Sequence, residues 1–145
     1  MSKSNAWENA LLLLLFNNTN AANIGDATGL RGSTTAGSLY LSLHTADPGE
    51  AGNQTTNEAA YTSYARKAVA RSGAGWTVAS NSAVLAANAD FVTATGGSET
   101  ETYFGIGTDP SGAGTLLYSG TISPNIVVSN GVTPTLTTGT TVTED

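Results

Sequence analysis

Three side chains in one short stretch are of the types that take part in nucleophilic catalysis. His44 is the only histidine of the chain, Ser42 lies two residues before it, and Asp47 lies three residues after it. A serine nucleophile also needs a sharp, exposed turn and an oxyanion hole. Neither a G-x-S-x-G sequence nor a comparable turn occurs in the chain. We therefore expect no enzyme and no catalytic residues, and we interpret His44 as a structural or surface histidine.

The sequence also gives no support for a metal or phosphate site. One histidine and no cysteine exclude the usual zinc ligand sets, and the D-x-D-x-D-G spacing of a calcium loop is missing. The glycines around Ile106 and Ala113 lack the lysine and the strand-to-helix context of a phosphate-binding loop. We therefore expect no metal and no cofactor.

Two aromatic residues stand just before the largest group of cations. Tyr61 and Tyr64 flank Thr-Ser, and Arg66, Lys67 and Arg71 follow them. Exposed aromatic side chains can bind carbohydrate, but tyrosines more often anchor a core or an interface. The three cations are too few for a nucleic-acid groove, so we expect them to pair with local carboxylates.

Composition limits the classes of partner. The chain has 145 residues, only 11% of them charged, a net charge of −6 and a pI of about 4.4. A nucleic-acid-binding protein needs a basic surface. The apolar run from Ala10 to Phe16 is far shorter than the roughly 20 residues that cross a bilayer. We therefore expect a chain made in the cytoplasm that binds neither nucleic acid nor membrane.

Hydrophobic alternation predicts that most of the chain is β-structure. Residues 39–44 alternate strictly, so the three leucines face one side of a strand, and Tyr40, Ser42 and His44 face outward. Turn signals at 109–112 and at Asn130-Gly131 predict two hairpins. Further short strands are expected at 63–70, 76–78, 83–85, 91–95, 103–107, 115–120, 126–128, 132–136 and 140–143. This spacing predicts an all-β fold, an antiparallel, jelly-roll-like β-sandwich with a short N-terminal α-helix.

The domain organisation follows from these elements. We predict a single domain over residues 1–145, with a helix at 5–17, a Gly/Thr/Asn-rich arm or loop at 18–37, and the sandwich at 38–145. Asn5 is the expected N-cap of the helix. Five consecutive leucines make the helix apolar nearly all round. It therefore either covers one end of the core or is shared with neighbouring subunits, through residues such as Leu12 and Leu15.

Four stretches together resemble a family of small structural proteins of tailed bacteriophages, described as head decoration or tail-fibre proteins. They are the strand Leu39–His44 with its Thr-Ala-Asp-Pro-Gly turn, the segment 57–66 ending in Tyr-Ala-Arg, Gly-Trp-Thr-Val at 75–78, and the Gly-Ile-Gly strand with Leu-Leu-Tyr-Ser-Gly at 116–120. The resemblance covers residues 5–143. It implies a virion component made in the bacterial host, and it brings no catalytic residues.

The first hypothesis is therefore a capsid decoration or cement protein that binds the major capsid protein, as a homotrimer, and stabilises the outer shell. The alternative is a tail-fibre or adhesin-like subunit that contacts a host receptor. A small hydrolase is a third hypothesis, which the missing catalytic residues disfavour. We expect the loops at 20–37 and 46–60 to bind other virion proteins. The candidate contact residues are Leu12, Leu15, Arg31, Tyr61, Tyr64 and Arg66.

Overall fold

The computed structural model describes residues 2–144, which form two compact units. Residues 2–38, 69–88 and 136–144 build the first unit, and residues 39–68 and 89–135 build the second. The chain crosses from one unit to the other after residues 38, 68, 88 and 135, so neither unit is a contiguous stretch of sequence. The single domain expected over residues 1–145 stays a prediction.

The first unit begins with α1 (Asn5–Asn17), which has the predicted bounds. Its N-cap is Ser4 rather than the expected Asn5: the Ser4 hydroxyl accepts a hydrogen bond from the backbone N–H of Trp7 at 3.4 Å. Asn18 ends the helix in the left-handed conformation, with φ of 55°. Asparagine tolerates this conformation better than most residues, which explains the sharp end of the helix.

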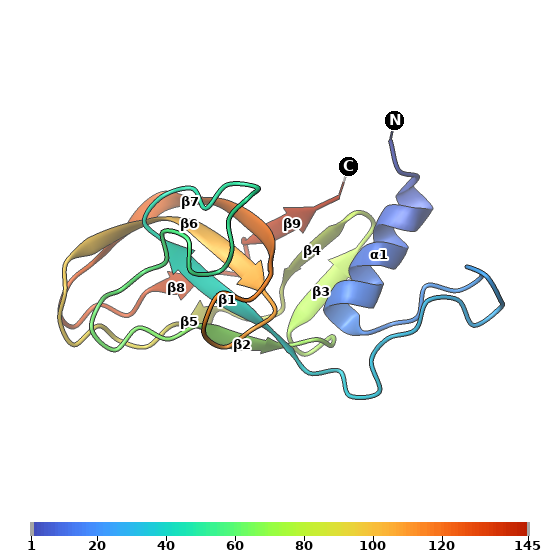
Figure 1. Cartoon of the computed structure of the whole chain (residues 1–145), viewed down its shortest axis with the longest axis horizontal. Helices are drawn as coiled ribbons and strands as arrows, with labels where there is room; N and C mark the ends of the chain where they lie inside the picture. Colours follow the sequence, from blue (N-terminus) through green and yellow to red (C-terminus); the bar gives the residue numbers. More distant parts are fainter. Residues whose placement is uncertain (1, 145) are drawn as a thin grey trace. The chain divides into compact units, whose positions relative to one another are not determined.

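The helix packs on a three-stranded antiparallel sheet within the same unit, as Figure 1 shows. The sheet has the order β3 (Trp76–Ala79), β4 (Ser82–Leu85), β9 (Thr141–Thr143). Phe16 of the helix meets Trp76 edge to face, with ring centroids 4.6 Å apart. The core of this unit therefore lies between one helix face and one sheet face, and its buried side chains include Leu12, Phe16, Trp76, Ala83, Leu85 and Val142.

The second unit contains the long strands (Figure 1). The strands β1 (Ser38–His44), β6 (Glu99–Gly107) and β7 (Leu116–Val128) pair antiparallel. Together with β2 (Lys67–Ala70) they form a sheet with the order β2-β1-β6-β7. The boundary between the units falls within β2. The predicted hairpin at 109–112 is confirmed, because β6 and β7 pair on either side of it.

The hairpin predicted at Asn130-Gly131 is wrong. A turn does form there, but the chain after it faces residues 91–94 instead of returning along β7: Ala94 donates to the carbonyl of Val132 at 2.8 Å, and Phe91 donates to that of Pro134 at 2.9 Å. Regular pairing of these two segments is limited to β5 (Ala89–Asp90) with β8 (Thr135–Leu136). The turn residues thus predict where the chain reverses, but they do not predict which segment pairs with the residues that follow the turn.

The predicted fold class is confirmed. Strands in antiparallel sheets dominate the structure, and α1 is the single helix among the described residues. In the second unit the predicted leucine face of β1 is buried together with aromatic and aliphatic residues of the neighbouring strands, namely Leu39, Leu41, Leu43, Phe104, Ile106 and Val128.

Candidate functional site

An ion pair in the second unit fastens the loop of residues 46–60 to its surroundings. Nε of Arg66 donates to Oε1 of Glu58 at 2.6 Å, and Nη2 donates to Oε2 at 2.8 Å. The same guanidinium donates to the carbonyls of Asp109 and Gly112, at 2.9 and 2.7 Å. These hydrogen bonds to Glu58 raise the pKa of Arg66. The expected pairing of Arg66 with a local carboxylate is confirmed, and the pair also holds the β6–β7 hairpin.

The two tyrosines belong to the same buried assembly. Tyr64 donates its hydroxyl hydrogen to Oε1 of Glu58 at 3.0 Å and accepts the backbone N–H of Leu43 at 3.1 Å. Burial raises the pKa of Tyr64 far above its ordinary value. Tyr61 is only 3% exposed, and its ring meets that of Tyr64 edge to face at 5.3 Å. Both rings therefore anchor the loop, and neither forms an exposed platform for carbohydrate.

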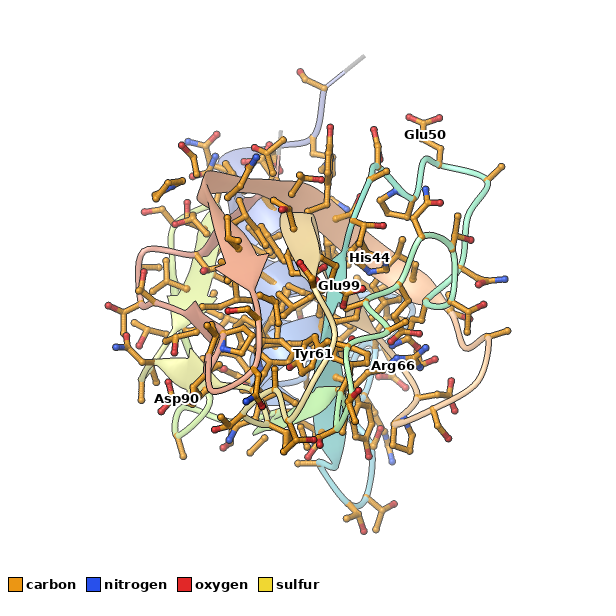
Figure 2. All side chains as sticks on the ribbon, turned by 90° about the vertical axis from the view of Figure 1, so that its left-hand side faces the viewer. His44, Glu50, Tyr61, Arg66, Asp90 and Glu99 are labelled. Carbon is orange, nitrogen blue, oxygen red and sulfur yellow. The ribbon has the colours of Figure 1, made fainter. Side chains whose placement is uncertain are left out.

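His44 lies inside the unit, so the prediction that it faces outward is wrong (Figure 2). Its Nδ1 lies 2.8 Å from the carbonyl oxygen of Thr56, which can only accept, so Nδ1 carries the hydrogen. Nε2 then accepts the hydroxyl hydrogen of Ser42 at 2.8 Å. Burial lowers the pKa of His44 and keeps the ring neutral. Ser42 and His44 have the hydrogen bond of a nucleophile and its base, yet both are fully buried.

A second anchor holds the same loop to the hairpin. The backbone N–H of Gln54 donates to Ala113 at 2.9 Å, and its side-chain Oε1 accepts the N–H of Asp109 at 3.0 Å. Gln54 is fully buried, against Gly107 of β6. A Cβ at Gly107 would lie 2.1 Å from Cδ of Gln54, so only glycine permits this approach. Sequence reasoning missed Gln54, because no local pattern separates it from the exposed polar residues around it.

Two carboxylates at the start of β6 have different surroundings. Oε1 of Glu99 accepts the backbone N–H groups of Ala60 and Tyr61 at 2.9 and 2.7 Å. Glu101 is fully buried, and neither of its side-chain oxygens has a hydrogen-bond partner. Burial, together with the negative charge of Glu99, raises the pKa of Glu101 to about 8. Because Glu99 and Glu101 are two residues apart, both lie on one face of the strand. This spacing is the one sequence signal that could have found the pair.

A surface hollow of about 390 Å³ lies between the start of the 46–60 loop and the start of β7. We call it the hollow. Asp47 and Glu50 are its charged residues, and both are exposed. Figure 2 shows Glu50 pointing outward from its loop. The loop side of the hollow thus carries two acidic residues and the β7 side two leucines, and the lining is Asp47, Gly49, Glu50, Gly52, Leu116, Leu117, Tyr118 and Ser119.

The arm at 18–37, in the first unit, is closed at its base by hydrogen bonds. The side chain of Asn18 donates to the carbonyl of Ser33 at 2.8 Å and accepts its N–H at 2.6 Å. Ala21 and Leu30 exchange two backbone hydrogen bonds of 2.9 and 3.0 Å. At Gly32 a Cβ would lie 2.3 Å from the carbonyl oxygen of Asn18, so a larger residue would push the two sides of the arm apart.

Arg71 joins the arm to the helix. Its guanidinium donates to the carbonyls of Leu14 and Leu15 at 2.9 and 2.7 Å, and to that of Ala36 at 3.0 Å. The last carbonyls of a helix lack partners within the helix and carry a partial negative charge, so a cation there is favourable. Arg71 was expected to pair with a carboxylate. It binds main-chain carbonyls instead.

The candidate contact residues differ in accessibility. Leu12 is fully buried and the Arg66 side chain is 2% exposed, so in this structure they stabilise their own units and are not available to a partner. Tyr61 is buried in the same way, whereas Leu15 is half-buried. Arg31 is exposed on the arm. Of these residues, Arg31 is the most accessible for a contact with another protein.

The described part of the chain contains no cluster of three or more histidine, cysteine or acidic residues that could hold a metal ion. Between residues 2 and 144 no helix is long and apolar enough to cross a membrane.

Comparison with known proteins identifies the family. The family model Gp80, described as podophage GP4 fiber I protein gp80, matches residues 2–144. No curated protein matches the chain. The family match confirms the resemblance to structural proteins of tailed phages, and its description names a fibre protein. The chain therefore belongs to the Gp80 family of podophage fiber I proteins and is a structural protein of the bacteriophage virion.

Proposed function

We propose that this chain is a subunit of a phage fibre, which is the alternative hypothesis from the sequence. The observation that carries the proposal is the family match, which spans residues 2–144 and has a fibre protein as its description. The same match gives no support to capsid decoration, the first hypothesis. The homotrimer expected from the sequence stays a proposal, which native mass spectrometry of the purified chain would test.

The role that we propose is structural rather than catalytic. Its support is the placement of Ser42 and His44, which are hydrogen-bonded to each other but fully buried. The other ring nitrogen of His44 is hydrogen-bonded to a backbone carbonyl of the 46–60 loop. A hydrolase must bring substrate within reach of its nucleophile. Hydrolysis of a model ester by the purified chain that disappears in Ser42→Ala would contradict this part of the proposal.

The location on the particle tests the fibre role. Purified virions are labelled with an antibody against the chain and viewed by electron microscopy, and mass spectrometry gives its copy number relative to the major capsid protein. We expect label at a fibre, a low copy number, and reduced adsorption to host cells of particles that lack the chain. Label spread over the shell in hundreds of copies, with unchanged adsorption, would favour the decoration hypothesis instead.

A further inference from the structure

The arm presents apolar side chains on an ordered support. Residues 22–28 are all exposed, and Ile24 and Leu30 keep 40% and 44% of their surface accessible. The tip is ordered by Asp26, whose Oδ1 accepts the N–H groups of Thr28 and Gly29 at 2.8 and 3.0 Å. Loops that bind partners are commonly held in this way on a rigid scaffold.

A cation without a partner stands beside these apolar residues. Arg31 is exposed, and its side chain makes no hydrogen bond or ion pair with residues 2–144. By contrast, Lys3 pairs with Glu144, Arg66 pairs with Glu58, and Arg71 binds carbonyls. The arm therefore combines two accessible aliphatic side chains with one unused positive charge.

The hollow has the complementary character. Leu116, Leu117 and Tyr118 line the hollow from β7, and Asp47 and Glu50 line it from the 46–60 loop. Asp47 already accepts the N–H of Gly49 at 2.8 Å, whereas Glu50 has no partner within the described chain. Its volume of about 390 Å³ is in the lower part of the range of ligand pockets, roughly 300–1,000 Å³, and suits a few side chains.

We propose that the arm of one copy seats in the hollow of a second copy. Ile24 and Leu30 then lie against Leu116 and Leu117, and Arg31 lies beside Glu50. A second copy is the occupant that the charges favour, because the arm carries an unpaired cation and the hollow an unpaired carboxylate. The inference goes beyond the fibre role, since the purified chain in solution tests it independently of any particle.

The geometry of such a contact has a consequence for assembly. The arm and the hollow are different surfaces, so the contact is heterologous and generates either a closed ring or an open chain of copies. One inserted arm is small beside the roughly 1,600 Å² of a standard stable interface. We therefore expect weak association that increases with concentration.

Charge exchange tests the proposed pairing. Dissociation constants are measured by analytical ultracentrifugation for the wild type, Arg31→Glu, Glu50→Arg and the double variant. Each single change should weaken association about tenfold, and the double variant should recover to within about threefold of the wild type. The matched control is Lys67→Glu, which reverses another exposed cation and should have no effect. For the apolar contact, Ile24→Ser should weaken association, whereas Val92→Ser, 48% exposed in the wild type, should not.

Cysteine cross-linking gives a second, direct readout. Because the chain has no cysteine, Arg31→Cys and Glu50→Cys each introduce a single thiol. Under mild oxidation an equimolar mixture should form the mixed disulfide dimer in preference to either symmetric dimer, and Lys67→Cys in place of Arg31→Cys should not. A wild type that stays monomeric at every concentration would overturn the proposal. Equal losses in the control variants, or a mixed dimer no more abundant than the symmetric ones, would overturn it as well.

Discussion

The substitution Glu101→Gln should make the protein more stable at neutral pH and leave it nearly unchanged in acid. Glu101 is fully buried, has no hydrogen-bond partner, and has a pKa raised from 4.5 to about 8 by burial and by Glu99. Glutamine has nearly the same shape and cannot ionise. The exchange therefore removes the ionisation of this group and little else.

The magnitude follows from proton linkage. Between pH 4.5 and about 8 the folded chain keeps a proton on Glu101 that the unfolded chain has released. Protonation then favours the folded state, so the stabilisation is fully present below pH 4.5 and is lost as the pH rises toward 8. Each pH unit in this window costs about 1.4 kcal/mol, so the loss by pH 7 is about 3 kcal/mol.

Urea unfolding of the wild type and of Glu101→Gln at pH 4.5, 5.5, 6.5, 7.5 and 8.5 measures the effect. Titrating groups that are not coupled to Glu101, such as His44, contribute to both proteins and cancel in the difference. We expect the variant to gain stability steadily with pH and to level off above pH 8. The control is Glu50→Gln, which neutralises an exposed carboxylate in place of a buried one. A difference for Glu101→Gln that does not grow with pH, or that matches the control, would refute the argument.

Two further predictions concern the anchors of the two units. Arg66→Ala leaves Glu58 poorly solvated and without its cation, so we expect a loss of about 3–5 kcal/mol in the free energy of unfolding, measured by urea titration. A loss below 1 kcal/mol would show that water replaces the guanidinium. Leu12→Ala should cost about 2–5 kcal/mol because it opens a cavity in a packed core. Leu15→Ala, at a half-buried position, should cost less. Equal melting temperatures for the two leucine variants would contradict the burial described for α1.

Part of the strand pattern was predictable from the sequence because alternation is a local property. The strand expected at 91–95 does not form, and only Thr135–Leu136 of the one expected at 132–136 is a strand. Residues 39–44 form a strand whose leucines are buried, as predicted, and the hairpin at 109–112 forms where its turn residues indicate. The orientation of Ser42 and His44 was not predictable. Their face is buried because the 46–60 loop folds back over it, and alternation within β1 contains no information on what covers either face.

The remaining misses have the same origin. Segments distant in sequence decide the surroundings of Gln54, Glu101 and Arg71. Gln54 contacts Asp109, and Arg71 contacts the end of α1. Asn130-Gly131 predicts a reversal of the chain, which occurs, but pairing across the turn depends on competition from residues 91–94. Local patterns thus predict elements, whereas long-range contacts decide which polar groups become buried.

The closed base of the arm makes its tip a site for engineering. The hydrogen bonds that hold the base join residues 18–21 to residues 30–33, and none of them involves the tip. Gly25 faces open space, with no atom within 4 Å of a Cβ built there. The φ of Gly25 is 82°, which favours glycine, so this residue is kept. A peptide epitope or a fluorophore tag inserted directly after Gly25 would thus be displayed away from the hydrogen bonds of the base. If arms seat in hollows, such a tagged subunit would also act as a chain terminator that limits how many copies assemble.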